Sequence, residues 1–180
     1  MDSLKIKGQI DFKIYKRFDS FFQRLALRFL NLVSPIHAQK FLDTYGVVRD
    51  AWQVNNLITT VGKAELANLA GNVSSPAYFT YLAAGTSNTA VAVGQTALGA
   101  EISTLGLSRA SATVSRITTT TTNDTLQLLK IWTASGTLAV EEIGIFNASS
   151  SGVMLGRALT TTKNIASGET FTGTYKVIFA

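Results

Sequence analysis

Apolar and polar residues alternate along the first segment of the chain. Charged or polar residues fill every second position, and most of the positions between them are apolar. Because successive side chains of a strand point to opposite faces, this period of two predicts a half-buried β-strand over residues 5–14. The apolar positions of this strand are Ile6, Ile10, Phe12 and Ile14.

The period changes immediately downstream to that of a helix. Apolar residues recur at intervals of three and four from residue 18 onward, which is typical of an amphipathic helix. Asp19 or Ser20 can cap the N-terminus of this helix. Ser34 ends it, because the residue before a proline avoids helical geometry. The apolar positions are Phe18, Phe22, Leu25, Phe29, Leu32 and Val33.

The predicted strand and helix admit two interpretations. In the first, both pack on their own domain. In the second, they form an arm that docks into a neighbouring subunit, since a strand outside the main series of strands can extend the edge of another sheet. In the second interpretation, the predicted partner-anchoring residues are Ile10, Phe12, Ile14, Phe18, Phe22, Leu25 and Phe29.

The rest of the chain divides into a connector and a β-rich region. Residues 36–58 contain apolar side chains without a period that assigns them. Residues 61–70 predict a short helix that is closed by Gly71 in the left-handed C-terminal position. From residue 78 onward, β-branched segments end in turn residues and predict strands. The expected strands cover residues 78–84, 109–121, 125–134, 137–147, 152–161 and 169–179.

Several strands at this spacing are typical of a sandwich or a small barrel. We predict a mainly-β fold: an antiparallel β-sandwich over residues 74–180, with an N-terminal strand–helix arm over residues 1–35. A connector with one further short helix spans residues 36–73. One strand is apolar on both faces, which indicates a central strand covered on both sides. Its apolar residues are Leu126, Leu128, Leu129, Ile131 and Trp132.

Composition argues against a catalytic role for this chain. Only 15% of its residues are charged, against about 25% in an ordinary globular domain. It has no cysteine, which excludes disulfides and thiolate metal sites. The net charge of +5 lies mostly in residues 1–50, which carry nine basic and five acidic residues. This basic segment can suit nucleic acid or anionic lipid, but such a segment is more often a solvated face or an arm that holds an acidic partner. Its strand and helix periods already explain its aromatic residues. No nucleic acid is therefore expected as a partner.

The candidate chemical groups are few. His37 is the only histidine, and the sequence offers it no nucleophile or orienting group. Glu141 and Glu142 are adjacent in a predicted strand, so they point to opposite faces and cannot act as a pair. One is expected at the surface, and the other is expected to pair with Arg157 or Arg109. We predict no catalytic, cofactor-binding or metal-binding residues, and no enzyme.

Two hydrophobic segments resemble targeting signals without the required composition. Residues 21–38 imitate a signal peptide, but Arg24 and Arg28 interrupt the apolar run, so no processing is expected. Residues 66–100 carry no charge, yet they are rich in Gly, Asn, Ser and Thr and contain Pro76. Such a segment leaves backbone groups unsatisfied in lipid, so no membrane span is expected.

From about residue 55 the chain contains a series of short motifs. They are Leu-Ile-Thr-Thr-Val-Gly-Lys-Ala-Glu-Leu-Ala-Asn-Leu at 57–69, Tyr-Phe-Thr-Tyr-Leu-Ala-Ala-Gly-Thr at 78–86, Thr-Ala-Leu-Gly-Ala-Glu-Ile at 96–102, Arg-Ala at 109–110, Val-Glu-Glu-Ile-Gly-Ile-Phe-Asn-Ala at 140–148 and Met-Leu-Gly-Arg at 154–157. In content and order they resemble bacteriophage tail-fibre and related virion structural proteins. The resemblance covers residues 55–180 and implies a non-enzymatic, usually oligomeric β-sandwich. The first fifty residues depart from the family pattern, which leaves the mode of attachment open.

These observations lead to one expected function and two alternatives. We expect a bacteriophage virion structural protein, tail- or fibre-associated, that is made in the host cytoplasm. Its β domain would form a homo-oligomer, with a trimer favoured, and its N-terminal arm would attach to tail, connector or capsid proteins. The alternatives are a capsid decoration (cement) protein and a carbohydrate- or cell-surface-binding module. In the binding module, loops such as residues 147–152 would contact the ligand.

Overall fold

In the computed structural model, which describes residues 5–180, nine strands and three helices follow one another along the chain. The strands are β1 (Ile6–Tyr15), β2 (Val48–Ile58), β3 (Tyr81–Gly85), β4 (Ala110–Ser111), β5 (Thr113–Ile117), β6 (Thr125–Thr133), β7 (Leu138–Phe146), β8 (Met154–Ile165) and β9 (Thr170–Phe179). The helices are α1 (Phe21–Val33), α2 (Pro35–Tyr45) and α3 (Thr60–Gly71). The predicted mainly-β, antiparallel fold is confirmed.

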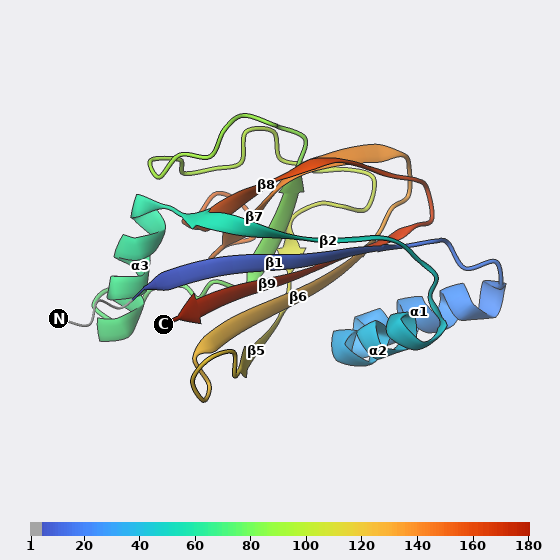
Figure 1. Ribbon diagram of the computed structural model, residues 1–180, viewed down its shortest axis with the longest axis horizontal. Coiled ribbons are helices and arrows are strands. Elements are labelled where there is room, and N and C mark those ends of the chain that lie inside the picture. The colour runs from blue at the N-terminus through green and yellow to red at the C-terminus, as the bar shows by residue number, and fades with distance from the viewer. Residues whose placement is uncertain (1–4) are drawn as a thin grey trace.

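All nine strands belong to one sheet, in the order β4-β3-β7-β8-β2-β1-β9-β6-β5, and every neighbouring pair is antiparallel. Strand β2 joins the two halves of the sheet, because it pairs with β1 along most of its length and with β8 at Leu57 and Ile58. The two edge strands, β4 and β5, are separated in the chain only by Ala112. The sheet therefore curves into a nearly closed structure whose halves enclose the core (Figure 1).

The core is built from the inward side chains of both halves of the sheet. On β1 the predicted period of two is observed, and Phe12 is only 2% exposed. Its ring stacks on Trp52 of β2 at 5.0 Å and on Phe171 of β9 at 5.5 Å between ring centroids. Trp132 of β6 continues the stack, 5.4 Å from Phe171. Aromatic rings from four adjacent strands thus stabilise the middle of the core.

Strand β1 does not form a separate arm, which corrects the predicted division of the chain. It lies inside the sheet, paired with β2 on one side and with β9 on the other. The predicted anchoring residues Ile10, Phe12 and Ile14 are buried in the protein's own core. Strands from all three predicted segments share one sheet, so the described residues form one β domain. The first four residues of the predicted arm lie outside the described residues.

The segment that the sequence left unassigned contains α2 and β2. Pro35 occupies the first turn of α2, where backbone N–H groups have no partner within the helix, so the missing N–H of proline costs no hydrogen bond. Helix α3 begins after Thr59, whose hydroxyl accepts the amide proton of Gly62. It ends one residue later than expected: Asn72, with φ of 47°, occupies the left-handed position predicted for Gly71. Asparagine tolerates this conformation, so the helix can extend through the glycine.

The prediction that one strand is covered on both faces is confirmed for β6. Leu128 and Trp132 face the core between the two halves of the sheet. Leu129 and Ile131 point to the opposite face, where they contact a second apolar cluster formed with α1 and α2. The continuous apolar run on β6 therefore reflects helices packed on the outside of the sheet.

Candidate functional site: an exposed apolar face on the helical hairpin

The helical hairpin, which consists of α1 and α2, is an insertion between β1 and β2. It projects from one end of the sheet, whereas α3 and the C-terminus lie at the opposite end (Figure 1). The amide of Lys16 donates to the carbonyl of Val47 at 2.9 Å and closes the base of the insertion. The inner side of the hairpin packs on β6 and β1. The residues of this contact are Tyr15, Phe18, Leu27, Ala38, Leu42, Leu129 and Ile131.

Two polar side chains of α1 bond to backbone carbonyls outside the helix. The guanidinium of Arg24 donates to the carbonyls of Phe18 and Asp19, both at 2.6 Å. The side-chain amide of Asn31 donates to the carbonyl of Ile131 on β6 at 3.2 Å. These two anchors, one near each end of the helix, set the rotation of α1 about its own axis.

As a result, the apolar stripe of α1 faces the solvent. Its six members span about 120° of the helix circumference at 100° per residue. Phe22 is 78% exposed and Leu32 is 84% exposed. A surface helix normally turns such a stripe toward the core, so α1 has the reverse orientation. The stripe consists of Phe21, Phe22, Leu25, Phe29, Leu32 and Val33.

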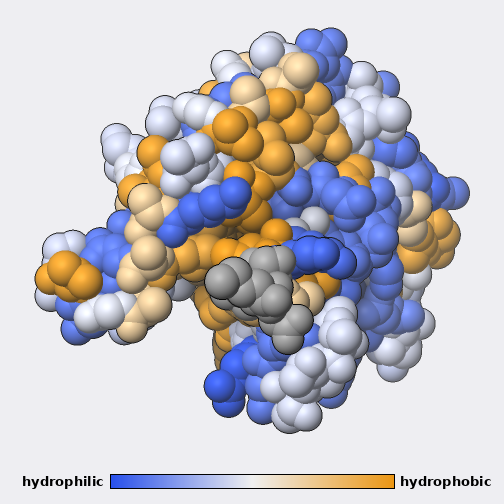
Figure 2. Space-filling view, turned by 60° about the vertical axis from the view of Figure 1, so that its left-hand side comes forward, coloured by the Kyte–Doolittle hydropathy of each residue, from blue (hydrophilic) through white to orange (hydrophobic). Residues whose placement is uncertain are grey.

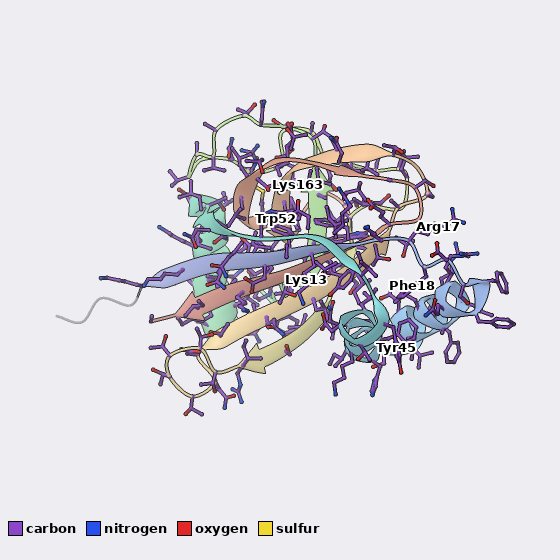
Figure 3. The ribbon with its side chains drawn as sticks, turned by 45° about the vertical axis from the view of Figure 1, so that its right-hand side comes forward. Lys13, Arg17, Phe18, Tyr45, Trp52 and Lys163 are labelled. Carbon is purple, nitrogen blue, oxygen red and sulfur yellow. The ribbon has the colours of Figure 1, made fainter. Side chains whose placement is uncertain are left out.

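Exposed apolar side chains continue from α1 onto α2. Ile36 follows the stripe in the first turn of α2, and Tyr45, Val47 and Val48 are exposed where α2 leads into β2. Figure 3 shows Phe18 where the chain enters α1 and Tyr45 at the end of α2. Several large apolar side chains exposed on one helix are typical of an interaction surface. We call the six-residue stripe of α1 the apolar face.

A groove of about 230 Å³ borders the apolar face. Phe21 and Leu25 supply apolar walls, and three guanidinium groups surround them, those of Arg17, Arg24 and Arg28. Among residues 5–180, none of these three arginines forms an ion pair. The groove therefore combines apolar walls with positive charge that no described carboxylate neutralises.

The β8–β9 turn forms the other side of the groove, and its glycine is required there. Gly168 has φ of +85°, a conformation that other residues rarely adopt. A Cβ atom on Gly168 would lie 2.5 Å from Cδ of Arg17. The glycine thus lets Arg17 lie against the turn, which places its side chain beside the groove. The sequence analysis left residues 162–168 between two expected strands and predicted no contact of this segment with the N-terminal segment.

A polar cluster attaches α2 to β1. The carboxylate of Asp43 accepts hydrogen bonds from Lys13 at 2.8 Å, from the Tyr15 hydroxyl at 2.6 Å and from Gln39 at 3.1 Å. Burial alone would raise the pKa of Asp43, but hydrogen bonds from Lys13, Tyr15 and Gln39 outweigh it and lower the pKa. Burial, helped by the adjacent Asp43, raises the pKa of Tyr15 to about 12.

Replacing Asp43 by asparagine is expected to lower the free energy of unfolding by about 0.5–1.5 kcal/mol at pH 7. The lowered pKa means that Asp43 stabilises the fold above its usual pKa of 3.8 and that this contribution is lost as the pH falls below it. The difference between wild type and D43N should therefore shrink on acidification. Urea unfolding at pH 7 and pH 3 measures both effects. An unchanged difference at pH 3 would contradict the ionic part of this interpretation.

The structure separates the predicted anchoring residues into two groups. Phe22, Leu25 and Phe29 lie together on the apolar face, whereas Phe18 is buried at its base and packs against Phe41 at 5.5 Å between ring centroids. The three anchoring residues of β1 are in the core, as described above. Three further members of the apolar face were absent from the predicted set: Phe21, Leu32 and Val33. Leu32 and Val33 already belonged to the predicted apolar stripe of the helix, and Phe21 adjoins Phe22 in the sequence.

A second apolar groove, of about 310 Å³, lies between α3 and the edge strand β5 at the opposite end of the molecule. Its walls include Leu66 and Leu69 of α3, Val114 of β5, and Tyr78, which precedes β3. The side chain of Tyr78 is largely exposed. Figure 2, which brings the α3 end toward the viewer, shows apolar side chains gathered on this face. Apolar surface is therefore exposed at both ends of the sheet.

The candidate groups His37 and Glu142 each have a polar partner in the described chain. The Ser34 hydroxyl, which precedes α2, lies 2.6 Å from Nδ1 of His37, but His37 is exposed and no described carboxylate orients its ring. Glu142 is buried and pairs with Arg157 at 2.6 Å, which confirms one of the predicted pairings. No group of three or more potential metal ligands is found among residues 5–180.

The loop at residues 147–152, considered above as a ligand-contacting loop, is held by internal bonds. Asn147 accepts the amide proton of Val153 at 2.7 Å, and the guanidinium of Arg109 donates to the carbonyls of Ala148 and Ser151. The nearby aromatic residue, Phe146, is buried under Arg109. The described contacts of this loop therefore do not favour a carbohydrate site.

No family model, curated protein or solved structure matches this chain. None of the helices in residues 5–180 combines the length and apolarity needed to cross a bilayer. A functional proposal must therefore rest on the surface of the protein itself. Its most distinctive feature is the outward apolar face of α1 with the basic groove beside it.

Proposed function

We propose that this chain is a non-enzymatic structural protein of a bacteriophage virion, tail- or fibre-associated, that docks onto another virion protein through the apolar face of α1. The reversed orientation of α1 is the observation that carries the proposal. Full burial of one Leu or Phe side chain contributes about 1.5–3 kcal/mol. Six such residues on one face can offset the entropy lost on association, which is the main cost of binding.

The rigidity of the hairpin supports a docking role. Helix α1 is held by Arg24 and Asn31, and α2 is held by the Asp43 cluster. A surface that is already ordered loses less conformational entropy on binding than a flexible one. The apolar face is therefore presented in a fixed orientation before any partner arrives. This is a property expected of an assembly component.

The opposite end of the molecule supports self-association through the β domain. The apolar groove between α3 and β5 lies beside an edge strand, whose free backbone groups are able to pair with another chain. A homo-oligomer, with a trimer favoured, would use this end and leave the helical hairpin free for attachment. The two surfaces lie far apart in the molecule, so both can be occupied together (Figure 1).

The proposal predicts that the chain is a stoichiometric component of purified phage particles, and that this depends on the apolar face. Replacing Phe22 and Phe29 by glutamine removes apolar area from exposed positions, so the fold should persist while incorporation falls at least about tenfold. Quantitative mass spectrometry measures the amount of the chain incorporated into purified particles. The particles come from phage supplied with either the wild-type chain or the F22Q/F29Q variant. Circular dichroism of the purified variant checks its fold.

Fractionation of the same particles separates the alternatives within this class. Recovery with isolated tails supports the tail or fibre location, whereas recovery with tail-less capsids at high copy number supports capsid decoration instead. The matched control is K40Q, which alters an exposed residue of α2 outside the apolar face. Equal incorporation of F22Q/F29Q and K40Q would contradict docking through α1, and absence of the wild-type chain from particles would contradict the virion role.

A further inference from the structure

The surroundings of the apolar face are strongly basic. Residues 16–42 contain a single carboxylate, that of Asp19, and five positively charged side chains. Lys16, Arg17 and Arg28 among them are exposed. The basic residues of this segment are Lys16, Arg17, Arg24, Arg28 and Lys40. The apolar face thus has a net positive border.

Among the described residues, none of the five basic side chains of residues 16–42 forms an ion pair, whereas six of the eleven outside this segment do. These ion pairs join cations to carboxylates within 2.5–2.8 Å, and the carboxylates lie on β1, β2 and β7, at the end of α2, in the loop before β4 and in the turn before β9. The basic partners in these pairs are Lys13, Arg49, Arg109, Arg157, Lys163 and Lys176. Arg17, Arg24 and Arg28 have no such partner among residues 5–180, although they surround a single groove.

The three arginines differ in how much hydrogen-bonding capacity they have left. Arg24 already donates to two backbone carbonyls. Arg17 and Arg28 are exposed, and the structure shows no hydrogen bond from either guanidinium to another described residue. Each guanidinium can donate two parallel hydrogen bonds to one carboxylate, a bidentate arrangement. The groove therefore has two free carboxylate-binding groups beside its apolar walls.

The shape and charge of this region distinguish between possible occupants. A second copy of this chain, placed face to face on α1, would bring the same basic border against itself, which is unfavourable. A lipid surface would satisfy the charge, but the groove is concave and side-chain-sized, as expected for a site that receives a protruding group. An acidic protein segment satisfies both the charge and the shape.

We propose that the groove beside α1 binds an acidic segment of the partner protein, with a Phe or Leu side chain inserted between Phe21 and Leu25. Carboxylates next to that side chain pair with Arg17 and Arg28. This inference rests on the proposed docking role of α1 and adds the chemical class of the partner. The apolar contacts supply affinity, and the ion pairs select the segment and its orientation.

Two synthetic helical peptides test the proposal directly. Both carry Leu and Phe at intervals of three and four; the first has Glu at the positions flanking this stripe, and the second has Lys there. Fluorescence anisotropy of the labelled peptides measures their binding to the full chain. We expect the acidic peptide to bind at least about tenfold more tightly than the basic one, with a difference that shrinks at high salt.

Charge reversal provides the matched variants. In R17E/R28E the preference should invert, so that the basic peptide binds more tightly, because both positions are exposed and the fold should persist. K40E, which reverses a single exposed charge outside the groove, should keep the wild-type preference. Equal binding of the two peptides to wild type would overturn the proposal. Two other results would overturn the proposal. The first is binding of the chain to phosphatidylglycerol vesicles without binding of either peptide. The second is concentration-dependent self-association of the chain that the F22Q/F29Q substitutions abolish.

Particle incorporation separates a failure of this inference from a failure of the proposed function. If F22Q/F29Q is lost from particles while R17E/R28E is retained, docking through α1 holds and the acidic partner is excluded. If both variants are incorporated like wild type, docking through α1 itself is excluded. Loss of both variants, together with inversion of the peptide preference, supports the two proposals jointly.

Discussion

Replacing Phe12 by alanine is expected to lower the free energy of unfolding by about 3–5 kcal/mol, as for other large truncations in cores. Phe12 is 2% exposed and stacks on both Trp52 and Phe171. Loss of the Phe12 ring would leave a cavity in the core at β1, which lies between β2 and β9 in the sheet. The rings of Trp52 and Phe171 can fill this cavity only in part. Guanidinium unfolding, followed by tryptophan fluorescence, measures the change because Trp52 lies in the same stack.

Lys7→Ala on the same strand is the control for F12A. Lys7 is exposed on the outer side of the sheet, so its loss should change stability by less than about 0.5 kcal/mol. By the same reasoning, a chain that lacks residues 1–15 should not fold, since β2 and β9 would lose their shared neighbour. If F12A were no more destabilising than K7A, β1 would not belong to the core, and the interpretation of the N-terminus as a separate arm would return.

The case of β1 shows what alternation in a sequence can and cannot establish. The period of two identified the strand and its buried face correctly. It did not identify the surface that covers this face, because a strand added to a neighbouring subunit has the same alternation. The information needed lies at the other end of the chain, where Ile6 pairs with Phe179 and Tyr15 with Thr170. Pairing between such distant segments leaves no local pattern.

Residues 36–58 show a second limit of the sequence analysis. Pro35 was used only as the stop of α1, although a proline also favours the first turn of a helix, as it does in α2. In β2, Trp52 and Val54 face inward in alternation, but the next inward position is the polar Asn56. One polar residue in the buried register was enough to obscure the period of this strand.

The candidate site was predictable in part. Helical spacing identified the stripe with Phe22, Leu25 and Phe29, because this spacing depends only on neighbouring residues. The direction in which the stripe faces could not be predicted. It follows from the bonds of Arg24 to backbone carbonyls and of Asn31 to Ile131, a residue 100 positions away. The groove likewise depends on Gly168, which approaches Arg17 only in the folded chain.

Exchanging Glu142 for glutamine is expected to lower the free energy of unfolding by about 3–5 kcal/mol, since it leaves a buried guanidinium without its counter-charge. Glu142 and Arg157 are both almost completely buried, and Nε of Arg157 donates to the carboxylate at 2.6 Å. The same carboxylate accepts the amide protons of Gly99 at 3.0 Å and Ala100 at 2.8 Å. The pair therefore also holds the long loop that connects β3 to β4.

Limited proteolysis provides a second readout, because release of residues 86–109 should expose new cleavage sites in E142Q. The control is E141Q, which changes the residue before Glu142 on β7. The Glu141 carboxylate accepts a hydrogen bond from the Thr162 hydroxyl at the surface. Its effect should stay below about 1 kcal/mol. A loss of similar size in both variants would contradict the assignment of the buried pair.

Adding Arg157→Met to E142Q separates the two contributions of Glu142. Methionine removes the unpaired charge and fills much of the same space, so the double variant should regain part of the stability lost in the single one. Recovery would show that the buried charge causes most of the loss. Without recovery, the loss of stability would arise from the loop. The amides of Gly99 and Ala100 lack their carboxylate acceptor in both variants. In the double variant, the Thr89 carbonyl also loses its hydrogen bond from the Arg157 guanidinium.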